Sequence, residues 1–292
     1  MRSSGVVPKT AATLALGIVA AAMLLPIALT VANSLMSELE IGRNYDLLDR
    51  MVDTAHGGAD AFAHLKVLPD WLTFEQFAQV LIRSPHFLSM FWNSAALVVP
   101  IVAGQTVVAS LAAYAFAKLR FIGRDKLFMV YLMTMLMPFQ VTLVPNYMVI
   151  DRLGLMNHAS AIILPGIFGA FGVFMLRQFM AHIPRGYAEA AKMDGAGHLT
   201  IFARIVLPLA KPGLSALTVL LFVDYWNMIE QPLIFLQDAV KQPLSLYLAQ
   251  INQHERGVGF AASALYMAPM VLLFLYAESD FVEGIQLSGI KG

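Results

Sequence analysis

The chain has 292 residues, of which 59% are hydrophobic and 13% are charged, and its basic and acidic residues balance. A soluble globular domain is about 45–50% apolar and about 25% charged, so this composition indicates a membrane protein. Balanced charge gives no basic field that would favour a nucleic acid partner. The chain contains no cysteine, which excludes disulfide bonds, thiolate metal sites and cysteine nucleophiles.

Six windows are long and apolar enough to cross a hydrocarbon core of about 30 Å as helices of roughly 20 residues. In chain order they are residues 11–32, 91–116, 127–150, 159–176, 209–229 and 258–277. The first window is longer than the roughly 7–15 residues of a signal-peptide core, so we expect it to be retained. Prolines interrupt several windows, and neighbouring helices can re-satisfy the backbone groups they free. The sequence predicts an all-α integral membrane protein with six transmembrane helices.

Lysine and arginine in the short loops predict the orientation of these spans. They gather after the second window and after the fourth, whereas the other short loops hold few: Lys118, Arg120, Arg124 and Lys126; then Arg177, Arg185, Lys192, Arg204 and Lys211. Loops rich in basic residues stay on the cytoplasmic side. With six spans, the N and C termini are then both cytoplasmic.

The long acidic segment after the first window is expected to lie outside the cell. We therefore divide the chain into residues 1–90, the first transmembrane helix plus an external loop, and residues 91–292, a five-helix core with a cytoplasmic loop at 179–208. Within the external loop, Thr73 and Gln76 have the spacing of a capping box, which predicts a short surface helix at about residues 74–82.

The second basic loop combines two short helices. Residues 187–193 are rich in alanine, whose small side chains let another protein surface approach closely, and Glu189 suits the dipole of a helix start. Gly195 would end this helix and let the chain turn. Residues 198–206 then form a second, amphipathic helix. Taken alone, this loop could be either a docking element or a helix lying on lipid.

The residue spacing in this loop resembles the EAA loop of the permease subunits of ATP-binding-cassette (ABC) importers. In that family the loop forms coupling helices that dock into a cleft on the ATPase subunit. The resemblance implies a type I importer permease fold and assigns ATPase coupling to Glu189, Ala190, Ala191, Asp194, Gly195, Ile205, Leu207 and Pro208.

Other segments resemble the carbohydrate-uptake branch of the same family. They are Asn93-Ser94, the segment Asp224-Tyr225-Trp226-Asn227 followed by Pro232-Leu233, and the C-terminal residues 288–292. One departure is Met228-Ile229-Glu230-Gln231, where many relatives have a more apolar stretch, and it leaves the exact substrate open. The resemblance implies a sugar or oligosaccharide as substrate.

The resemblance also implies the partners and the location. We expect a heterodimer with a second permease subunit, an ABC ATPase dimer, an extracytoplasmic solute-binding protein, and a multi-pass position in the lipid of a bacterial or archaeal cell (inner) membrane. The sequence has no G-x-x-x-x-G-K-[ST] phosphate loop, so ATP and Mg would be bound by the partner ATPase. We expect no catalytic residue, no cofactor and no metal site in this chain.

A sugar needs a polar path, because each unsatisfied polar group costs several kcal/mol in hydrocarbon. Candidates are the polar and aromatic side chains within the spans: Gln140, Asn146, Tyr147, Tyr225, Trp226, Asn227 and Tyr266. Helix packing or an interfacial aromatic belt would also explain them. Intramembrane carboxylates usually face the bundle interior or water; we favour the outer mouth for Glu230 and leave Asp224 undecided.

Three other functions remain as alternatives. The first is an importer of the same architecture for a polyol, a phosphodiester or an amino acid. The second is an ion-coupled secondary transporter, which would usually show inverted repeats. The third is a membrane enzyme acting on lipids, which would need acidic or histidine residues clustered at one membrane face.

Overall fold

The structure is a computed structural model that describes residues 9–53, 66–249 and 256–289. Within these ranges every regular element is a helix, as predicted from the sequence. The chain divides into two compact units. The first, unit 1, comprises residues 1–88 and 248–267, and the second, unit 2, comprises residues 89–247 and 268–292.

Unit 1 begins with a long apolar helix. Its elements are α1 (Lys9–Ser34), α2 (Glu38–Asp53), α3 (Glu75–Ala78) with the π-helical turn Gln79–Arg83, and the adjoining parts of α4 (Pro85–Lys118), α14 (Leu244–Ala249) and α15 (Arg256–Gly289). The apolar side chains of α1 are exposed along most of its length, for example Leu16 and Met23 at 70% and 72%. An exposed apolar helix of 26 residues has the length and chemistry of a membrane span.

Polar contacts join α2 to the segment before α3. Glu40 is 8% exposed and accepts hydrogen bonds from the backbone N–H of Asp70 at 2.9 Å and from Lys66 Nζ at 2.9 Å. Lys66 also pairs with Asp70 at 2.6 Å. The hydrogen bonds to Asp70 and Glu40 raise the pKa of Lys66, since they favour its charged form.

The short helix expected near residues 74–82 forms, but its start differs from the prediction. Phe74 occupies the N-cap position, and the Thr73 hydroxyl accepts a hydrogen bond from the Glu75 backbone N–H at 3.2 Å. Gln76 is buried and donates to Glu38 Oε2 at 2.9 Å instead of closing a capping box. The capping box is therefore wrong, because a partner on α2, distant in sequence, draws Gln76 inward, while Phe74 and Ile82 remain exposed.

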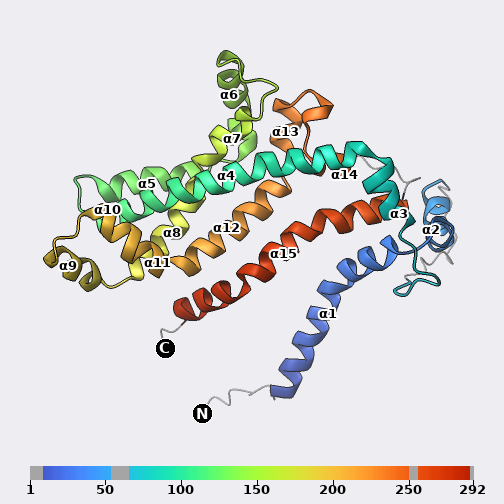
Figure 1. Cartoon of the computed structure of the whole chain (residues 1–292), viewed down its shortest axis with the longest axis horizontal. Coiled ribbons are helices and arrows are strands. Elements are labelled where there is room, and N and C mark those ends of the chain that lie inside the picture. The colour runs from blue at the N-terminus through green and yellow to red at the C-terminus, as the bar shows by residue number, and fades with distance from the viewer. Residues whose placement is uncertain (1–8, 54–65, 250–255, 290–292) are drawn as a thin grey trace, which may run out of the picture. The chain divides into compact units, whose positions relative to one another are not determined.

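Unit 2 holds most of the helices that are long or paired enough to span a membrane. Besides most of α4, its transmembrane-type elements are α5 (Arg124–Met135), α6 (Phe139–Arg152), α7 (Ser160–Ile167), α8 (Ala170–His182), α12 (Lys211–Trp226) and the second half of α15. Both α5 and α12 pack against α8 (Figure 1). Small residues permit this packing, since Gly213 on α12 lies directly against the ring of Phe179 on α8.

The apolar interior of unit 2 joins helices that are far apart in sequence. Leu97 and Ile101 on α4 pack with Ile150 on α6, Ile162 on α7 and Phe235 on α13 (Glu230–Phe235). The Asn93 side chain ties α4 to the turn after α13 by donating to the carbonyl oxygens of residues 240 and 242, at 2.6 and 3.1 Å. The next residue, Ser94, accepts a hydrogen bond at Oγ from the Leu244 N–H at 2.9 Å. Both residues of the family-like Asn93-Ser94 pair therefore hold α4 against the segment that follows α13.

Among the residues that the structure describes, four helical stretches are long and apolar enough to cross a membrane: Thr10–Ser34, Pro85–Lys118, Ser160–His182 and Arg256–Asp280. The third and fifth windows are not straight helices. Arg124–Met135 and Phe139–Arg152 meet at 96°, and His198–Leu209 and Lys211–Trp226 meet at 75°. Pro138 begins α6 in an extended conformation, and proline cannot continue a helix from the preceding turn. The chain has six spans if each bent pair crosses once, and this count stays a prediction.

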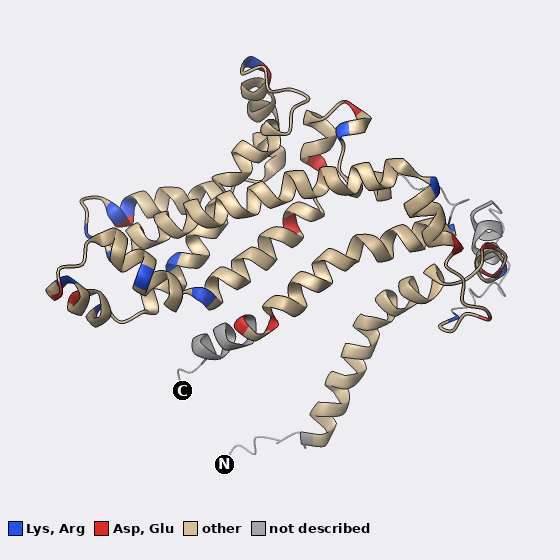
Figure 2. Ribbon diagram, viewed as in Figure 1, with Lys and Arg blue, Asp and Glu red and all other residues tan. Residues whose placement is uncertain are grey.

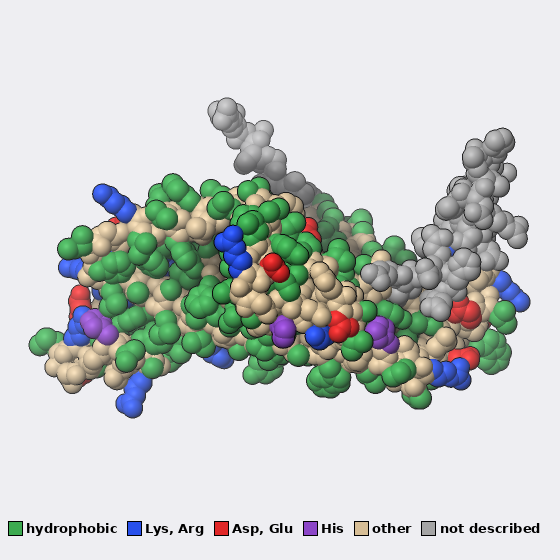
Figure 3. Space-filling model, turned by 90° about the horizontal axis from the view of Figure 1, so that it is seen from above, with side chains coloured by type: hydrophobic (Ala, Val, Ile, Leu, Met, Phe, Trp, Pro, Cys, Tyr) green, Lys and Arg blue, Asp and Glu red, His purple; other side chains and the backbone are tan. Residues whose placement is uncertain are grey.

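Charged side chains are few within the long helices of unit 2, among them Arg177 on α8, Asp224 on α12 and Asp280 on α15. Lysine and arginine gather where α9 (Arg185–Met193) and α10 (His198–Ile201) lie beside the ends of α4 and α5 (Figure 2). Hydrophobic side chains cover much of the face that Figure 3 shows for this part of the chain, with basic side chains at its end. This distribution is that of a protein whose helices lie in hydrocarbon and whose loops lie in water.

Candidate functional site

The loop that follows α8 folds as two helices joined by a tight turn. α9 spans Arg185–Met193, and α10 continues through the π-helical turn Phe202–Val206 into α11 (Leu207–Leu209). No α9 residue is buried within the chain, and Met193 is 89% exposed. The loop therefore presents α9 as a largely exposed helix that can meet a partner.

Gly195 makes the turn between these helices. Its φ is +81°, a left-handed conformation that side chains other than glycine rarely adopt, and a Cβ at this position would meet no atom within 4 Å. The Gly195 N–H donates to the Lys192 carbonyl at 3.0 Å and the Ala196 N–H to the Ala191 carbonyl at 2.9 Å. These bonds close the C-terminal end of α9 and fix its direction relative to α10.

The residues expected to couple to an ATPase lie on this hairpin. Glu189, Ala190 and Ala191 are on α9, and Asp194 and Gly195 follow at its end. Ile205, Leu207 and Pro208 lie on the π-helical turn and on α11, where the hairpin returns toward α12. The structure thus places all eight on one continuous helix-turn-helix segment.

A basic cavity lies beside α9. It has a volume of about 560 Å³ and is lined by side chains from α4, α9 and α10 and from the loop between α4 and α5. Its charged lining consists of Lys118, Arg120, Arg124, Arg185 and Lys192 together with Glu189. The sequence showed these cations only as loop charges, and the folding of four segments against one another brings them to a common cavity.

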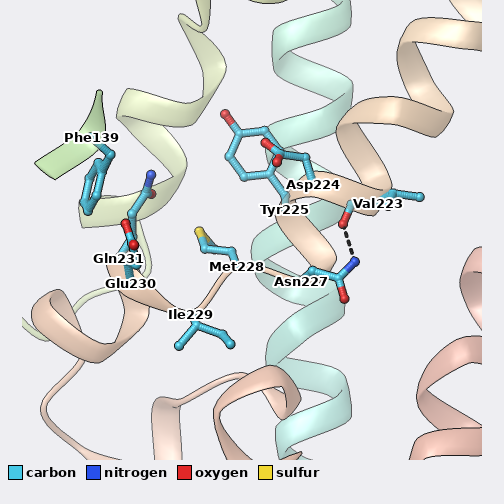
Figure 4. A pocket seen from close by; sticks show the side chains of 9 residues that line it. All are labelled: Phe139, Val223, Asp224, Tyr225, Asn227, Met228, Ile229, Glu230 and Gln231. Atoms are coloured by element: carbon cyan, nitrogen blue, oxygen red, sulfur yellow. Dashed lines mark hydrogen bonds between the residues drawn. The ribbon is translucent and has the colours of Figure 1, made fainter. Parts of the chain in front are cut away.

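A second cavity, about 410 Å³ in volume, lies where α12 ends and α13 begins (Figure 4). Its polar lining comes from Asp224, Tyr225, Asn227, Glu230 and Gln231, and Phe139, Val223, Met228 and Ile229 complete it. Asp224 and Tyr225 project from the end of α12, while Glu230 and Gln231 lie near Phe139 (Figure 4). We refer to it as the acidic cavity, because both of its charged lining residues are carboxylates.

Hydrogen bonds hold the polar residues of the acidic cavity in place. Gln140 on α6 donates to the Glu230 carboxylate at 3.0 and 3.3 Å, which joins α6 to α13. The Tyr225 hydroxyl donates to the Gly166 carbonyl at 3.2 Å. Asn227 donates to the Val223 carbonyl at 2.7 Å and so caps the last turn of α12. Tyr225 and Asn227 therefore line the acidic cavity, and Gln140 orients one of its carboxylates.

The other candidates for a substrate path lie elsewhere. Trp226 is 2% exposed and packs between Phe222 and Phe91, with ring centroids 5.1 and 5.5 Å away, so it belongs to the packed interior. Asn146 and Tyr147 are on α6 but do not line the acidic cavity. Tyr266 is on α15 in unit 1 and is 8% exposed.

Carboxylates and histidines do not gather into metal sites in the part of the chain that the structure describes. The lining of the acidic cavity offers hydrogen-bond acceptors and an apolar wall. The sequence did not indicate the lining by Phe139 and Gln231. The break from the apolar pattern at Glu230-Gln231 was the signal that could have pointed to this turn.

Comparisons with known proteins agree on the family. The family described as "Binding-protein-dependent transport system inner membrane component" matches residues 105–278. The arabinooligosaccharides transport system permease protein AraQ of Halalkalibacterium halodurans is 30% identical over 229 residues, covering 77% of this chain and 81% of that protein. The sn-glycerol-3-phosphate transport system permease protein UgpE of Pectobacterium atrosepticum is 33% identical over 201 residues, covering 67% and 72%.

A solved structure supports the fold. A chain from the crystal structure of a bacterial ABC transporter involved in the import of the acidic polysaccharide alginate superposes with a TM-score of 0.76 at 23% identity. The match covers 96% of this chain and 99% of that chain. The chain therefore belongs to the binding-protein-dependent transport inner membrane components, the multi-pass permease subunits of ABC importers, which are transport components and not enzymes.

Proposed function

We propose that this chain forms, with a second permease subunit, the translocation path for an uncharged sugar or oligosaccharide. The observation that carries this proposal is the acidic cavity, where hydrogen-bond acceptors from Asp224, Asn227 and Glu230 lie beside the Tyr225 and Phe139 rings. Sugars present many hydroxyl donors and apolar ring faces, and a path across hydrocarbon must replace the hydrogen bonds they lose.

The charge of the acidic cavity decides between substrate classes. Known relatives include permeases of systems named for an arabinooligosaccharide and for sn-glycerol-3-phosphate, so the family carries both neutral and anionic solutes. Asp224 and Glu230 line the cavity here, and no lysine or arginine does. An anionic solute would meet like charges in this cavity, which opposes its binding, whereas a neutral hydroxylated solute gains acceptors.

ATP binding and hydrolysis by the partner subunits would act on this chain through α9. An external binding protein delivers the sugar, and two ATPase subunits in the cytoplasm bind ATP and Mg and close on the α9–α10 hairpin. Because Glu189 to Gly195 form an exposed helix ending in a fixed turn, their movement is transmitted through α11 to α12, whose far end lines the acidic cavity. The path then switches between inward- and outward-facing states. The tail at residues 290–292, a further suggested contact, lies outside the described residues.

The test is uptake by the complete importer in proteoliposomes, with its binding protein outside and ATP inside. Labelled neutral disaccharides and arabinooligosaccharides are compared with sn-glycerol-3-phosphate and oligouronates. We expect uptake of a neutral sugar and none of the anions. ATP-driven uptake of an anionic solute in preference to neutral sugars would refute the substrate class.

A substitution in the acidic cavity tests whether this cavity lies on the path of the substrate. Glu230→Gln removes the charged acceptor that Gln140 orients, and hydrogen bonds to charged groups contribute about 1.5–3 kcal/mol, so we expect uptake to fall about tenfold or more. The matched control is Glu278→Gln on α15, an exposed carboxylate that does not line the cavity. Equal uptake by both variants would show that the path lies elsewhere.

An ion-coupled transporter is the rival mechanism. It needs no ATPase, so uptake that persists without ATP and follows a proton or sodium gradient would support it. The family match argues against this rival, since the family is that of binding-protein-dependent systems.

A further inference from the structure

The basic cavity beside α9 is not explained by transport of a sugar. Five lysine or arginine side chains and one carboxylate, Glu189, form its charged lining. A neighbouring cavity of about 570 Å³ shares Arg120, Arg124 and Arg185 with it and adds Lys126 and Asp125. The two cavities together form a hollow with excess positive charge, which raises the local concentration of anions.

Part of this charge is already used within the chain. Arg124 pairs with Asp125 at 3.0 Å, and Lys118 Nζ donates to the Ile183 carbonyl. Within the ranges that the structure describes, no ion pair is formed by Arg120, Arg185 or Lys192. These three cations come from the α4–α5 loop and from both ends of α9, so an anion between them would join the loop to α9.

The neighbours of Arg120 indicate where this anion comes from. Phe121 and Ile122 follow it directly, are 41% and 104% exposed, and precede Arg124. Apolar side chains exposed between cations, at the end of the spanning helix α4, are typical of the boundary between lipid headgroups and acyl chains. A soluble anion would satisfy the cations but leave Ile122 exposed to water, whereas a phospholipid supplies both an anionic headgroup and apolar chains.

We propose that this hollow binds the phosphate headgroup of an anionic phospholipid from the membrane leaflet next to α9. Basic pockets between spanning helices are a known way of holding such headgroups. Arg120, Arg185 and Lys192 contact the phosphate, and Phe121 and Ile122 extend into the adjoining acyl region. The lipid fixes α9 against the α4–α5 loop, so the lipid composition of the membrane affects how firmly the coupling helix is held.

The test measures lipid retained by the intact importer complex. The complex is placed in nanodiscs of equal parts phosphatidylcholine and phosphatidylglycerol, extracted, and analysed by native mass spectrometry. We expect the wild type to retain phosphatidylglycerol and Arg120→Gln to retain about fivefold less, the effect of one basic residue near an anionic surface. The control is Arg152→Gln, an exposed arginine at the end of α6 outside both cavities, and it should retain as much as the wild type.

A second measurement needs no variant. Wild-type complex is irradiated with phosphatidylglycerol carrying a photoreactive headgroup, and the adduct is mapped by peptide mass spectrometry. We expect adducts within residues 118–124 or 185–192. Adducts only elsewhere, or equal retention of phosphatidylglycerol by the wild type and Arg120→Gln, would overturn the proposal.

Two further measurements distinguish a phospholipid from the other possible ligands of the hollow, soluble phosphate and a protein surface. If inorganic phosphate stabilises the wild type against heat but not Arg120→Gln, and phosphatidylglycerol is not retained, the site binds soluble phosphate and the lipid proposal is wrong. If Arg120→Gln releases the ATPase subunits yet keeps its phosphatidylglycerol, the hollow is a protein docking surface. Neither readout depends on which solute is transported, so the proposed function can fail while this inference stands.

Discussion

Single side chains decide how closely the helices of unit 2 approach. A Cβ on Gly213 would lie 2.6 Å from Cγ and 3.0 Å from Cβ of Phe179, so α12 and α8 meet almost backbone to ring. A buried polar side chain can also bind a partner outside its own helix. Gln76 donates a hydrogen bond to Glu38 on α2 and not to the start of α3. At this scale the partner, and not the local sequence, fixes the role of a residue.

The first prediction is that Gly213→Ala destabilises the protein. The new methyl group meets the root of the Phe179 ring, which cannot move without shifting α8, and overpacking typically costs about 1–3 kcal/mol. Helix propensity offsets about 0.5–1 kcal/mol of this. Thermal unfolding of the purified protein should show a lower midpoint.

Gly186→Ala is the control for this substitution, since a Cβ there meets nothing within 4 Å and the residue is also helical. Its midpoint should equal or exceed that of the wild type. Equal midpoints for the two variants would mean that α8 and α12 are not packed as closely as described.

At the scale of elements, the proposed function depends on the α9–α10 hairpin and on the bent helix pairs. The hairpin leaves α9 largely exposed and holds it by the turn at Gly195. The α5–α6 pair bends at Pro138, which brings Gln140 on α6 to Glu230 on α13. The chain thus has an exposed helix at one site and a polar cavity at another, with α11 and α12 between them.

The second prediction concerns the turn at Gly195. Gly195→Asp places a side chain at φ +81°, which costs about 1–2 kcal/mol but causes no clash, so the protein should fold and insert while α9 changes direction. We expect uptake in proteoliposomes to fall about tenfold while ATP hydrolysis continues, because α9 no longer docks on the ATPase in the right direction.

Gly197→Asp is the matched control, because it adds the same charge at an ordinary φ of −73° with open space around it. It should keep uptake and hydrolysis coupled. Wild-type uptake by Gly195→Asp would show that the direction of α9 is unimportant, and equal losses in both variants would assign the effect to charge.

At the scale of the whole molecule, exposed apolar helices and basic loops describe a protein in a bilayer. Four continuous stretches and two bent pairs can span it, and basic side chains gather where α9 lies (Figure 2). By the positive-inside rule we expect α9 to lie in the cytoplasm and the turn after α13 outside. This orientation is required if an ATPase is to reach α9.

The third prediction tests that orientation by labelling. Because the chain has no cysteine, each introduced cysteine is unique. Met193→Cys, at a position 89% exposed, should react with a membrane-impermeant thiol reagent only after the cells are opened. Val240→Cys, at a position 65% exposed, should react in intact cells. Labelling of Met193→Cys in intact cells would reverse the topology.

The sequence by itself determined the membrane class, the helical fold, the family and the loop that holds the eight residues expected to couple to an ATPase. These depend on the length of apolar stretches and on spacing within one loop, and both are local properties of the chain. Glycine at position 195 likewise needs no partner, since its left-handed turn is a property of its own backbone.

Only the tertiary structure decided which side chains share a site. It placed Trp226 in an aromatic core, while its neighbours Tyr225 and Asn227 line the acidic cavity, a difference that sequence position cannot show. In the structure, the third window bends at Pro138. The cations that line the basic cavity come from separate segments of the chain. The physical reason is that burial, hydrogen-bond partners and charge clusters arise from contacts between distant residues, which a local pattern does not contain.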